Sequence, residues 1–287
     1  MTLNLNAPAK INLSLDVLGR RDDGYHAVEM VMQTIGLCDT ISLKSRTDGI
    51  IQVRCTHPQV PANEENIAYK AASLLKELSG NKRLGATIEI AKNIPAAAGL
   101  GGGSADAAAV LKGLNALWDL RLSPGELSRA GLQLGADVPY CLMGGTALAR
   151  GIGEMLTPLP PPPSFWVVLL KPKAGVSTAD VYKRYNEALV RRRPNNEALV
   201  AALAAGSEEN ISKAMANVLE SVTFSLLPIL GHLKQQALEY GAFASQMTGS
   251  GPTIFALASD SRRAAAIYNG LKNQVDFAYI TTFKEVP

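Results

Sequence analysis

The amino-acid sequence predicts an α+β fold in two domains. Segments with strand character crowd the N-terminal half of the chain, and segments with helix character crowd the C-terminal half. Pro158–Pro163 contains five prolines in six residues, a stiff stretch that is typical of a connector. The length of 287 residues fits two moderate domains. We therefore expect one domain over residues 1–157 and another over residues 158–287.

Alternating apolar and polar residues predict the first strand, Ala9–Val17, as half-buried, because every second side chain from Ile11 onward is apolar. A cluster of turn-forming residues follows at Arg20–Gly24. A helix is expected over Glu64–Leu78, because its apolar residues recur on one face. The other strands expected in this half are Asp39–Lys44, Ile50–Cys55, Ala86–Ala91 and Gly145–Arg150.

Two later helices have start signals in the sequence. Ser104 is placed to cap a helix over Ala105–Leu117. Ser123–Glu126 is a clearer start, in which a serine is followed by proline and then by a capping-box glutamate, and Gly135 is expected to end that helix. The C-terminal half is expected to contain helices up to about Leu238, a helix near Arg262–Leu271, and strands at Phe165–Leu170, Thr253–Ala258 and Asp276–Phe283.

The composition is ordinary for a globular protein, with 47% apolar and 18% charged residues. The 28 basic and 25 acidic residues nearly cancel, which gives no support for a nucleic-acid partner or a polybasic membrane contact. The densest basic run, Arg191–Arg193, is expected to lie in a solvated loop.

The cysteines and histidines bear on whether the protein contains disulfides or a zinc site. The three cysteines and three histidines are scattered, which argues against a disulfide framework or a zinc site and favours a reducing compartment. The N-terminus lacks a signal-peptide pattern, and no apolar run approaches the ~20 residues of a membrane helix. We expect a cytoplasmic protein.

The segment Ala96–Ala109 has four glycines within five positions, between a predicted strand and a predicted helix. Amide groups at a helix start have no intrahelical partner and carry partial positive charge. Glycines without a Cβ let a phosphate approach such amides closely. This context favours an anion cradle over a linker, and a glycine-rich helix entry that serves only close packing stays the alternative.

The commonest phosphate loops do not fit this segment. A Walker A loop needs a lysine after its last glycine, and the segment contains none. A dinucleotide fingerprint needs a third glycine where Ser104 stands, and no acidic residue is evident at the end of a following strand to hold a ribose. A nicotinamide-dependent oxidoreductase is therefore disfavoured.

Three ordered motifs resemble those of the GHMP kinases, which are ATP-dependent small-molecule kinases. Residues 7–13 (APAKINL) are similar to the N-terminal motif of this family, residues 95–105 (PAAAGLGGGSA) to its central phosphate-binding motif, and residues 247–253 (MTGSGPT) to its C-terminal glycine-rich loop. Together they span nearly the whole chain. The resemblance implies a two-domain α+β fold with the active site in the interdomain cleft.

Two further motifs, GYH at residues 24–26 and GADVPY at residues 135–140, resemble one branch of this family. That branch uses ATP to phosphorylate the 2-hydroxyl of 4-diphosphocytidyl-2-C-methyl-D-erythritol, a cytidine-diphosphate-linked methylerythritol, in the non-mevalonate route to isoprenoid precursors. The resemblance implies that Asp137 is the base for the attacking hydroxyl and that the Lys10 ammonium is its catalytic partner. ATP chemistry implies Mg²⁺, with Ser104 as the candidate ligand, although the carboxylate of other family members has no clear match here.

The resemblance also assigns binding residues. The expected ATP-binding residues are Pro95, Ala96, Ala97, Ala98, Gly99, Leu100, Gly101, Gly102, Gly103, Ser104 and Ala105, with Asn66 and Lys92 beside them. The expected substrate-binding residues are Asn12, Tyr25, His26, Asp137, Tyr182, Thr248, Gly249, Ser250 and Gly251. For Tyr182, a place in the core of its helix is the equal alternative.

A non-catalytic nucleotide-binding protein of the same fold stays a second hypothesis. The joint presence of Lys10 and Asp137 argues against it, because a binding module does not need both. We expect a monomer or a weak homodimer.

Overall fold

The computed structural model describes residues 2–285, and its contacts divide the chain into two compact units. Unit 1 comprises Met1–Ala9, Leu37–Ala96 and Gly101–Met143, and unit 2 comprises Lys10–Gly36, Ala97–Leu100 and Gly144–Pro287. Two strands, β1 (Thr2–Asn12) and β3 (His26–Arg46), each have one end in unit 1 and the other in unit 2. The expected domain boundary at residues 157 and 158 stays a prediction.

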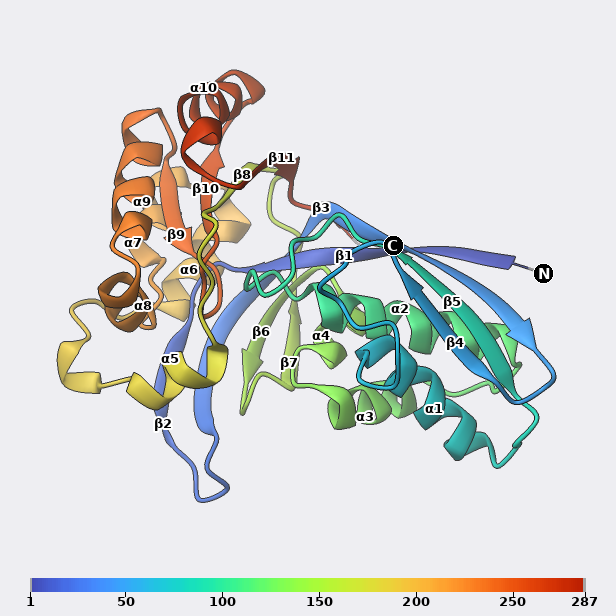
Figure 1. Ribbon diagram of the computed structural model, residues 1–287. Coiled ribbons are helices and arrows are strands. Elements are labelled where there is room, and N and C mark those ends of the chain that lie inside the picture. The colour runs from blue at the N-terminus through green and yellow to red at the C-terminus, as the bar shows by residue number, and fades with distance from the viewer. Residues whose placement is uncertain (1, 286–287) are drawn as a thin grey trace. The chain divides into compact units, whose positions relative to one another are not determined.

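Unit 1 contains the N-terminal part of β1, the C-terminal part of β3, two further strands and four helices in the described residues. Strand β5 (Gly85–Ala91) pairs in parallel with β4 (Ile51–Cys55) and in antiparallel with the C-terminal part of β3. Helix α1 packs on α2 and on strands β4 and β5, and α2 also contacts α3 and α4 (Figure 1). The helices are α1 (Ile67–Ser79), α2 (Gly102–Leu117), α3 (Pro124–Leu134) and α4 (Val138–Met143).

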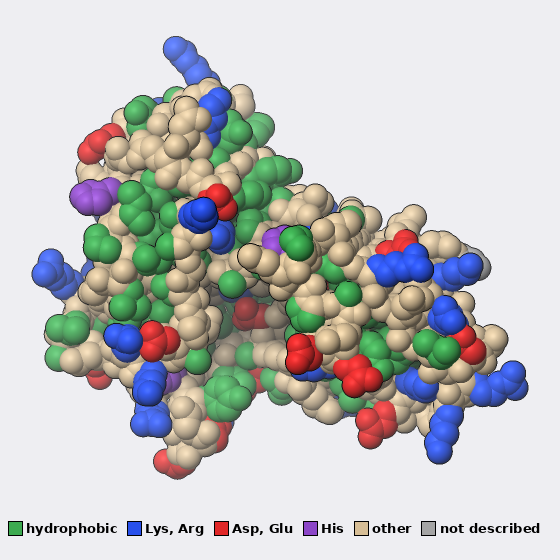
Figure 2. Space-filling view, viewed as in Figure 1, with side chains coloured by type: hydrophobic (Ala, Val, Ile, Leu, Met, Phe, Trp, Pro, Cys, Tyr) green, Lys and Arg blue, Asp and Glu red, His purple; other side chains and the backbone are tan. Residues whose placement is uncertain are grey.

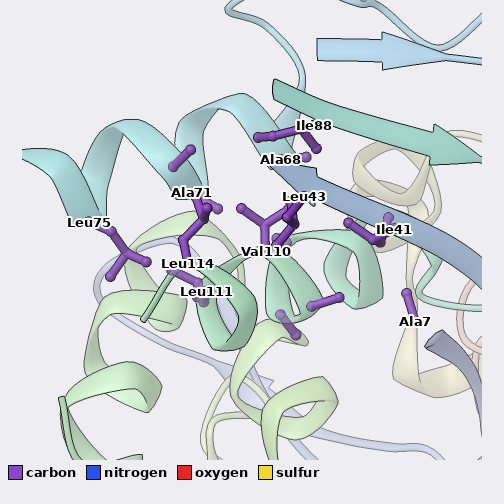
Figure 3. Close-up of a cluster of buried hydrophobic side chains, with 14 of the residues drawn as sticks. Ala7, Ile41, Leu43, Ala68, Ala71, Leu75, Ile88, Val110, Leu111 and Leu114 are labelled. Carbon is purple, nitrogen blue, oxygen red and sulfur yellow. The ribbon is translucent and has the colours of Figure 1, made fainter. Parts of the chain in front are cut away.

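The core of unit 1 lies between these strands and the first two helices (Figure 3). Leu43 and Ile88 project from the strands, and Leu75 from α1 and Leu114 from α2 pack against the same cluster. A Cβ at Gly113 of α2 would lie 2.3 Å from a methyl carbon of Leu43, so a larger residue there would force the Leu43 side chain to move. This packing holds the C-terminal half of α2 against the sheet.

Unit 2 contains an antiparallel sheet in the order β11-β8-β10-β9. Its central strand β8 is the buried apolar run predicted from FWVVLL. Helices α9 and α10 pack beside this sheet (Figure 1). The strands are β8 (Trp166–Lys171), β9 (Ala244–Met247), β10 (Ile254–Ala258) and β11 (Phe277–Thr282), and the two helices are α9 (Ile229–Glu239) and α10 (Ser261–Leu271).

The remaining strands of unit 2 pair with one another and with the N-terminal part of β3. Strand β2 (Asp16–Arg20) pairs with β3 across the turn that contains Tyr25, with a bulge after Val17. Strand β6 (Thr146–Arg150) lies between β3 and β7 (Met155–Leu159). The helices not yet described are α5 (Thr178–Arg184), α6 (Asn196–Ala205), α7 (Glu208–Ala214) and α8 (Glu220–Leu226), with the short helical turns η1 (Glu187–Leu189) and η2 (Lys272–Gln274).

Several local predictions are confirmed and others are wrong. Helix α3 has the predicted capping box, because the Ser123 and Glu126 side chains each accept a backbone N–H at the helix start. Helix α2 begins at Gly102 and not at Ala105, because Gly101 in a left-handed conformation, and not Ser104, forms its N-cap. Strands β2, β7 and β9 were not predicted.

Surface charge follows the balanced composition. On the face that Figure 2 shows, Lys and Arg side chains are interspersed with Asp and Glu side chains on both units. In the described part of the chain, residues 2–285, no helix is long and apolar enough to span a membrane.

Candidate active site

The glycine loop, which is the part of the glycine segment Ala96–Ala109 before α2, has several residues with positive φ angles. Ala97, Gly99 and Gly101, which alternate along the chain, have φ angles of 48°, 74° and 71°. Alternation of left-handed residues turns successive amide groups toward one side, which makes a concavity suited to an anion. Ala97 is not a glycine, so its positive φ costs about 1 kcal/mol and persists only because the surroundings impose it. The backbone supports the interpretation of this loop as an anion cradle.

The loop is held against the C-terminal glycine-rich segment, and this contact lies within unit 2. A Cβ at Gly99 would lie 2.5 Å from the carbonyl oxygen of Thr248 and 3.1 Å from that of Gly251. The hydroxyl of Thr248 lies 3.2 Å from the carbonyl oxygen of Gly99. Two motifs that are about 150 residues apart in the sequence are therefore in direct contact, and the contact requires glycine at position 99.

The N-terminal motif joins the same contact. The amide of Lys10 donates to the carbonyl oxygen of Leu100 at 3.0 Å, and the amide of Asn12 donates to the hydroxyl of Thr248 at 3.1 Å. The Lys10 ammonium donates to Oδ1 of Asn12 at 2.8 Å. Lys10 and Asn12 are only 5% and 1% exposed, so the prediction that residues 9–17 form a half-buried strand is wrong. Both faces are buried because the polar face supports the glycine loop.

Asn217 is a residue of this arrangement that sequence reasoning missed. Its amide nitrogen donates to the carbonyl oxygens of Met247 and Gly249, at 2.8 Å each. Its Oδ1 accepts the amide of Leu219 at 3.0 Å. The side chain thus fixes the backbone around Thr248. No motif marks Asn217, and only its place in the fold reveals this role.

Unit 1 contains a buried ion cluster, and its lysine lies shortly before the glycine loop in the sequence. The Lys92 ammonium pairs with Asp39 and, at 2.8 Å, with Asp106 of α2. Asp39 also accepts the amides of Asn93 and Ile94 at 2.6 and 2.8 Å, so it fixes the backbone that leads into the loop. Lys92 was expected to bind ATP; its ammonium already faces two carboxylates, and the ATP role stays a prediction.

Asp106 carries an unusual proton affinity. Burial and, less strongly, the neighbouring Asp39 raise the pKa of its carboxyl to about 7, although the Lys92 ammonium opposes the rise. Its Oδ1 atom is buried without a hydrogen-bond partner. Asp106 therefore keeps its proton at mildly acidic pH, and sequence reasoning did not identify it.

Three other expected residues of unit 1 have local structural positions. The Asn66 side chain caps α1 by accepting the amide of Ala68 at 2.9 Å. Ser104 lies in the first turn of α2, and Asp137 directly precedes α4 and is half-buried. The roles proposed for these residues in ATP binding, Mg²⁺ binding and catalysis stay predictions.

An aromatic cluster in unit 2 joins two distant segments. The His26 ring lies 5.3 Å from the Tyr182 ring and 6.2 Å from the Tyr185 ring, centroid to centroid. Tyr25 is 62% exposed. Tyr182 is half-buried, and the buried residue of α5 is Val181, so Tyr182 is not a core residue of its helix. Tyr185 was not predicted as part of this cluster.

A magnesium site made of protein side chains alone does not fit the residues present. Among the residues that the structure describes, no group of three or more His, Cys, Asp or Glu side chains is placed to hold a metal ion. The close carboxylate pair, Asp39 and Asp106, is bridged by Lys92.

Family models match both parts of the chain. The model of the GHMP kinases N terminal domain matches residues 66–145, which contain the glycine loop. The model of the GHMP kinases C terminal matches residues 199–276, which contain the Thr248 segment. The chain belongs to the GHMP kinase family. The family predicted from three motifs is thus confirmed, and the chain is a small-molecule kinase of α+β fold.

Relatives within the GHMP kinases extend along nearly the full chain. A 4-diphosphocytidyl-2-C-methyl-D-erythritol kinase from Alkaliphilus metalliredigens is 49% identical over 94% of this chain and 92% of its own. One of the same name from Bacillus velezensis is 50% identical over 95% of this chain and 94% of its own. A crystal structure of a 4-(cytidine 5'-diphospho)-2C-methyl-D-erythritol kinase is 35% identical, with a TM-score of 0.85 over 99% of this chain and 100% of its own.

Proposed function

We propose that this GHMP kinase transfers the γ-phosphoryl group of ATP to the 2-hydroxyl of 4-diphosphocytidyl-2-C-methyl-D-erythritol, which yields the 2-phosphate and ADP. The observation that carries the proposal is the 49–50% identity to kinases named for this substrate, over at least 92% of their length. These relatives match 94–95% of this chain, so the likeness extends along nearly all of it.

Binding and positioning supply most of the catalysis of phosphoryl transfer. The glycine loop offers backbone amides to the ATP phosphates, and its contacts with Thr248 and with the amide of Lys10 hold it in the binding conformation before ATP arrives. Pre-organisation of this kind avoids an entropic cost at the moment of binding. Pro95–Ala105 is the segment that we assign to the phosphates.

Proton transfer is assigned to Asp137. Its carboxylate takes the proton of the attacking hydroxyl, and the Lys10 ammonium offsets negative charge on the transferring group. Asn12 fixes the position of that ammonium through the 2.8 Å bond to its Oδ1. A Mg²⁺ ion bound with ATP would offset phosphate charge, and the Ser104 hydroxyl is the side chain that we assign to it.

The acceptor's cytidine is assigned to Tyr25, His26 and Tyr182. Aromatic side chains stack on nucleobases, and an imidazole can hydrogen-bond a base edge. The methylerythritol part is assigned to Asn12, and the diphosphate to Thr248, Gly249, Ser250 and Gly251. A cytoplasmic location is part of the proposal, and the scattered cysteines of the sequence favour it. A monomer or a weak homodimer, without a nucleic-acid partner, completes the proposal.

A coupled ADP-release assay over a panel of alcohols tests the proposal. We expect ADP release with 4-diphosphocytidyl-2-C-methyl-D-erythritol and none above background with homoserine or mevalonate. Turnover of homoserine or mevalonate alone would move the chain to another branch of the GHMP kinases. ATP binding without turnover of any acceptor would favour the non-catalytic hypothesis.

A further inference from the structure

The basic run Arg191–Arg193 lies in an exposed loop, as expected, but its third arginine is paired with two carboxylates. The Arg193 guanidinium pairs with the Asp16 carboxylate and, through its other terminal nitrogen, with Glu187. The nitrogen that pairs with Asp16 also donates to the carbonyl oxygen of Val17 at 3.1 Å. The Arg193 side chain is only 35% exposed. One side chain therefore joins strand β2 to the short helical turn η1.

These two attachment points belong to the two sides of the aromatic cluster. Asp16 and Val17 lie in β2, which pairs with the start of β3 where His26 lies. Glu187 follows Tyr182 and Tyr185 closely in the sequence. Arg193 therefore pairs with a residue of the segment on each side of the cluster.

The residues around Arg193 are themselves held in place by hydrogen bonds. The Asp16 side chain is 12% exposed and also accepts the amide of Val17 at 2.9 Å. Burial raises the pKa of Asp16, and the Arg193 charge opposes the rise. Nearby, the Asn196 side chain donates to Glu29 of β3 at 2.9 Å and accepts from the hydroxyl of Ser14. The segment after Arg193 is thus also attached to the strand pair.

We propose that Arg193 is a positioning residue for recognition of the cytidine base, because it holds the His26 side and the Tyr182–Tyr185 side of the aromatic cluster at the spacing that a base requires. Arg193 itself does not touch the base. The planar guanidinium suits this role, since separate nitrogens bind separate partners in a fixed geometry, which a lysine cannot do. The inference rests on the proposed function and concerns the acceptor subsite only.

The test compares Arg193→Met with Arg191→Met, a matched control at an exposed arginine of the same run. Steady-state kinetics with 4-diphosphocytidyl-2-C-methyl-D-erythritol and calorimetric titration with CDP are the readouts. For Arg193→Met we expect KM for the acceptor and Kd for CDP to rise by roughly 10- to 100-fold, while kcat and KM for ATP stay near wild type. For Arg193→Lys, KM for the acceptor and Kd for CDP should lie between the values of wild type and Arg193→Met. Arg191→Met should match wild type in both constants.

Three outcomes would overturn the inference. The first is an unchanged KM for the acceptor in folded Arg193→Met protein. The second is an equal loss of ATP and CDP affinity, which would indicate a general structural role. The third outcome concerns the case in which Arg193→Met does not fold. In that case, wild-type CDP affinity of Arg193→Lys would overturn the inference. A wild-type enzyme that neither binds CDP nor turns over the acceptor would instead refute the proposed function, and the inference with it.

Discussion

Asp137 is the residue on which the proposed chemistry depends most directly. Asp137→Asn removes the base but keeps the shape of the side chain, so we expect kcat to fall by roughly 10²- to 10⁴-fold. KM for ATP should stay near the wild-type value, because the glycine loop is unchanged. Steady-state ADP release measures both constants, and Asp119→Asn, at a side chain that is 73% exposed, is the matched control. Full activity of Asp137→Asn would exclude Asp137 as the base.

Asp106 makes stability depend on pH. The native carboxyl titrates near 7, whereas the unfolded carboxyl titrates near 3.8. Between these values the native state binds more protons, so this group's contribution to stability is complete below pH 4 and is lost as the pH rises through 7. In Asp106→Asn, the fall in unfolding free energy from pH 5 to pH 8 should be smaller by about 1–3 kcal/mol. Urea unfolding at both pH values measures the difference.

A control separates this effect from general changes in charge. Asp119→Asn removes an exposed carboxylate and should keep the wild-type pH dependence. An identical pH dependence in Asp106→Asn and wild type would show that Asp106 titrates normally. The sequence places Asp106 within the glycine segment Ala96–Ala109, but the pKa of its carboxyl is raised first by burial and then by Asp39, and both causes arise only in the folded unit.

At the scale of elements, the backbone conformation of the glycine loop depends on Gly99 in particular. Gly99→Ala adds a Cβ 2.5 Å from the Thr248 carbonyl oxygen, at a residue with a φ of 74°. The loop must shift, so we expect a loss of about 1–3 kcal/mol in unfolding free energy and a higher KM for ATP. Thermal unfolding and ADP-release kinetics measure these changes.

Gly175→Ala is the matched control for this prediction. An added Cβ there meets open space, with nothing within 4 Å, and the residue has no positive φ. It should leave both stability and KM for ATP near wild type. Wild-type behaviour of Gly99→Ala would mean that the loop tolerates a displaced backbone, and that its fixed conformation is not needed for ATP binding.

Elements were predicted well where the signal was local. The capping box of α3 combines a serine, a proline and a glutamate within four residues, so it is evident in the sequence and is present in the structure. The predicted start of α2 at Ala105 was wrong. Gly101 caps this helix through a left-handed backbone conformation, and no side chain in the sequence indicates that conformation. The 21-residue strand β3 was predicted only at Asp39–Lys44, since its N-terminal part follows a turn and belongs to unit 2.

At the scale of the whole molecule, stability depends on the core of each unit. Leu75 and Leu78 lie on the same helix, α1, but are 0% and 55% exposed. Leu75→Ala should cost about 2–5 kcal/mol of unfolding free energy, because it leaves a cavity in the unit 1 core. Leu78→Ala should cost less than about 1 kcal/mol. Urea unfolding measures both, and equal costs would contradict the placement of this core.

The sequence could not show which residues make up each unit. Unit 2 takes residues from the N-terminal, central and C-terminal parts, and the four residues Ala97–Leu100 interrupt unit 1. Those four residues belong to unit 2 because Gly99 and Leu100 contact Thr248 and Lys10. Contacts between residues so distant in sequence depend on the whole fold.

The sequence by itself determined the family, the α+β class and the likeness of the glycine segment to a phosphate loop, because these depend on local composition and on ordered motifs. The tertiary structure alone decided that Lys10 and Asn12 are buried, that Asp106 is a weak acid beside Asp39, and that Arg193 joins the two sides of the aromatic cluster. The physical reason is that burial and charge pairing belong to neighbours in space, which the chain brings together only when it folds.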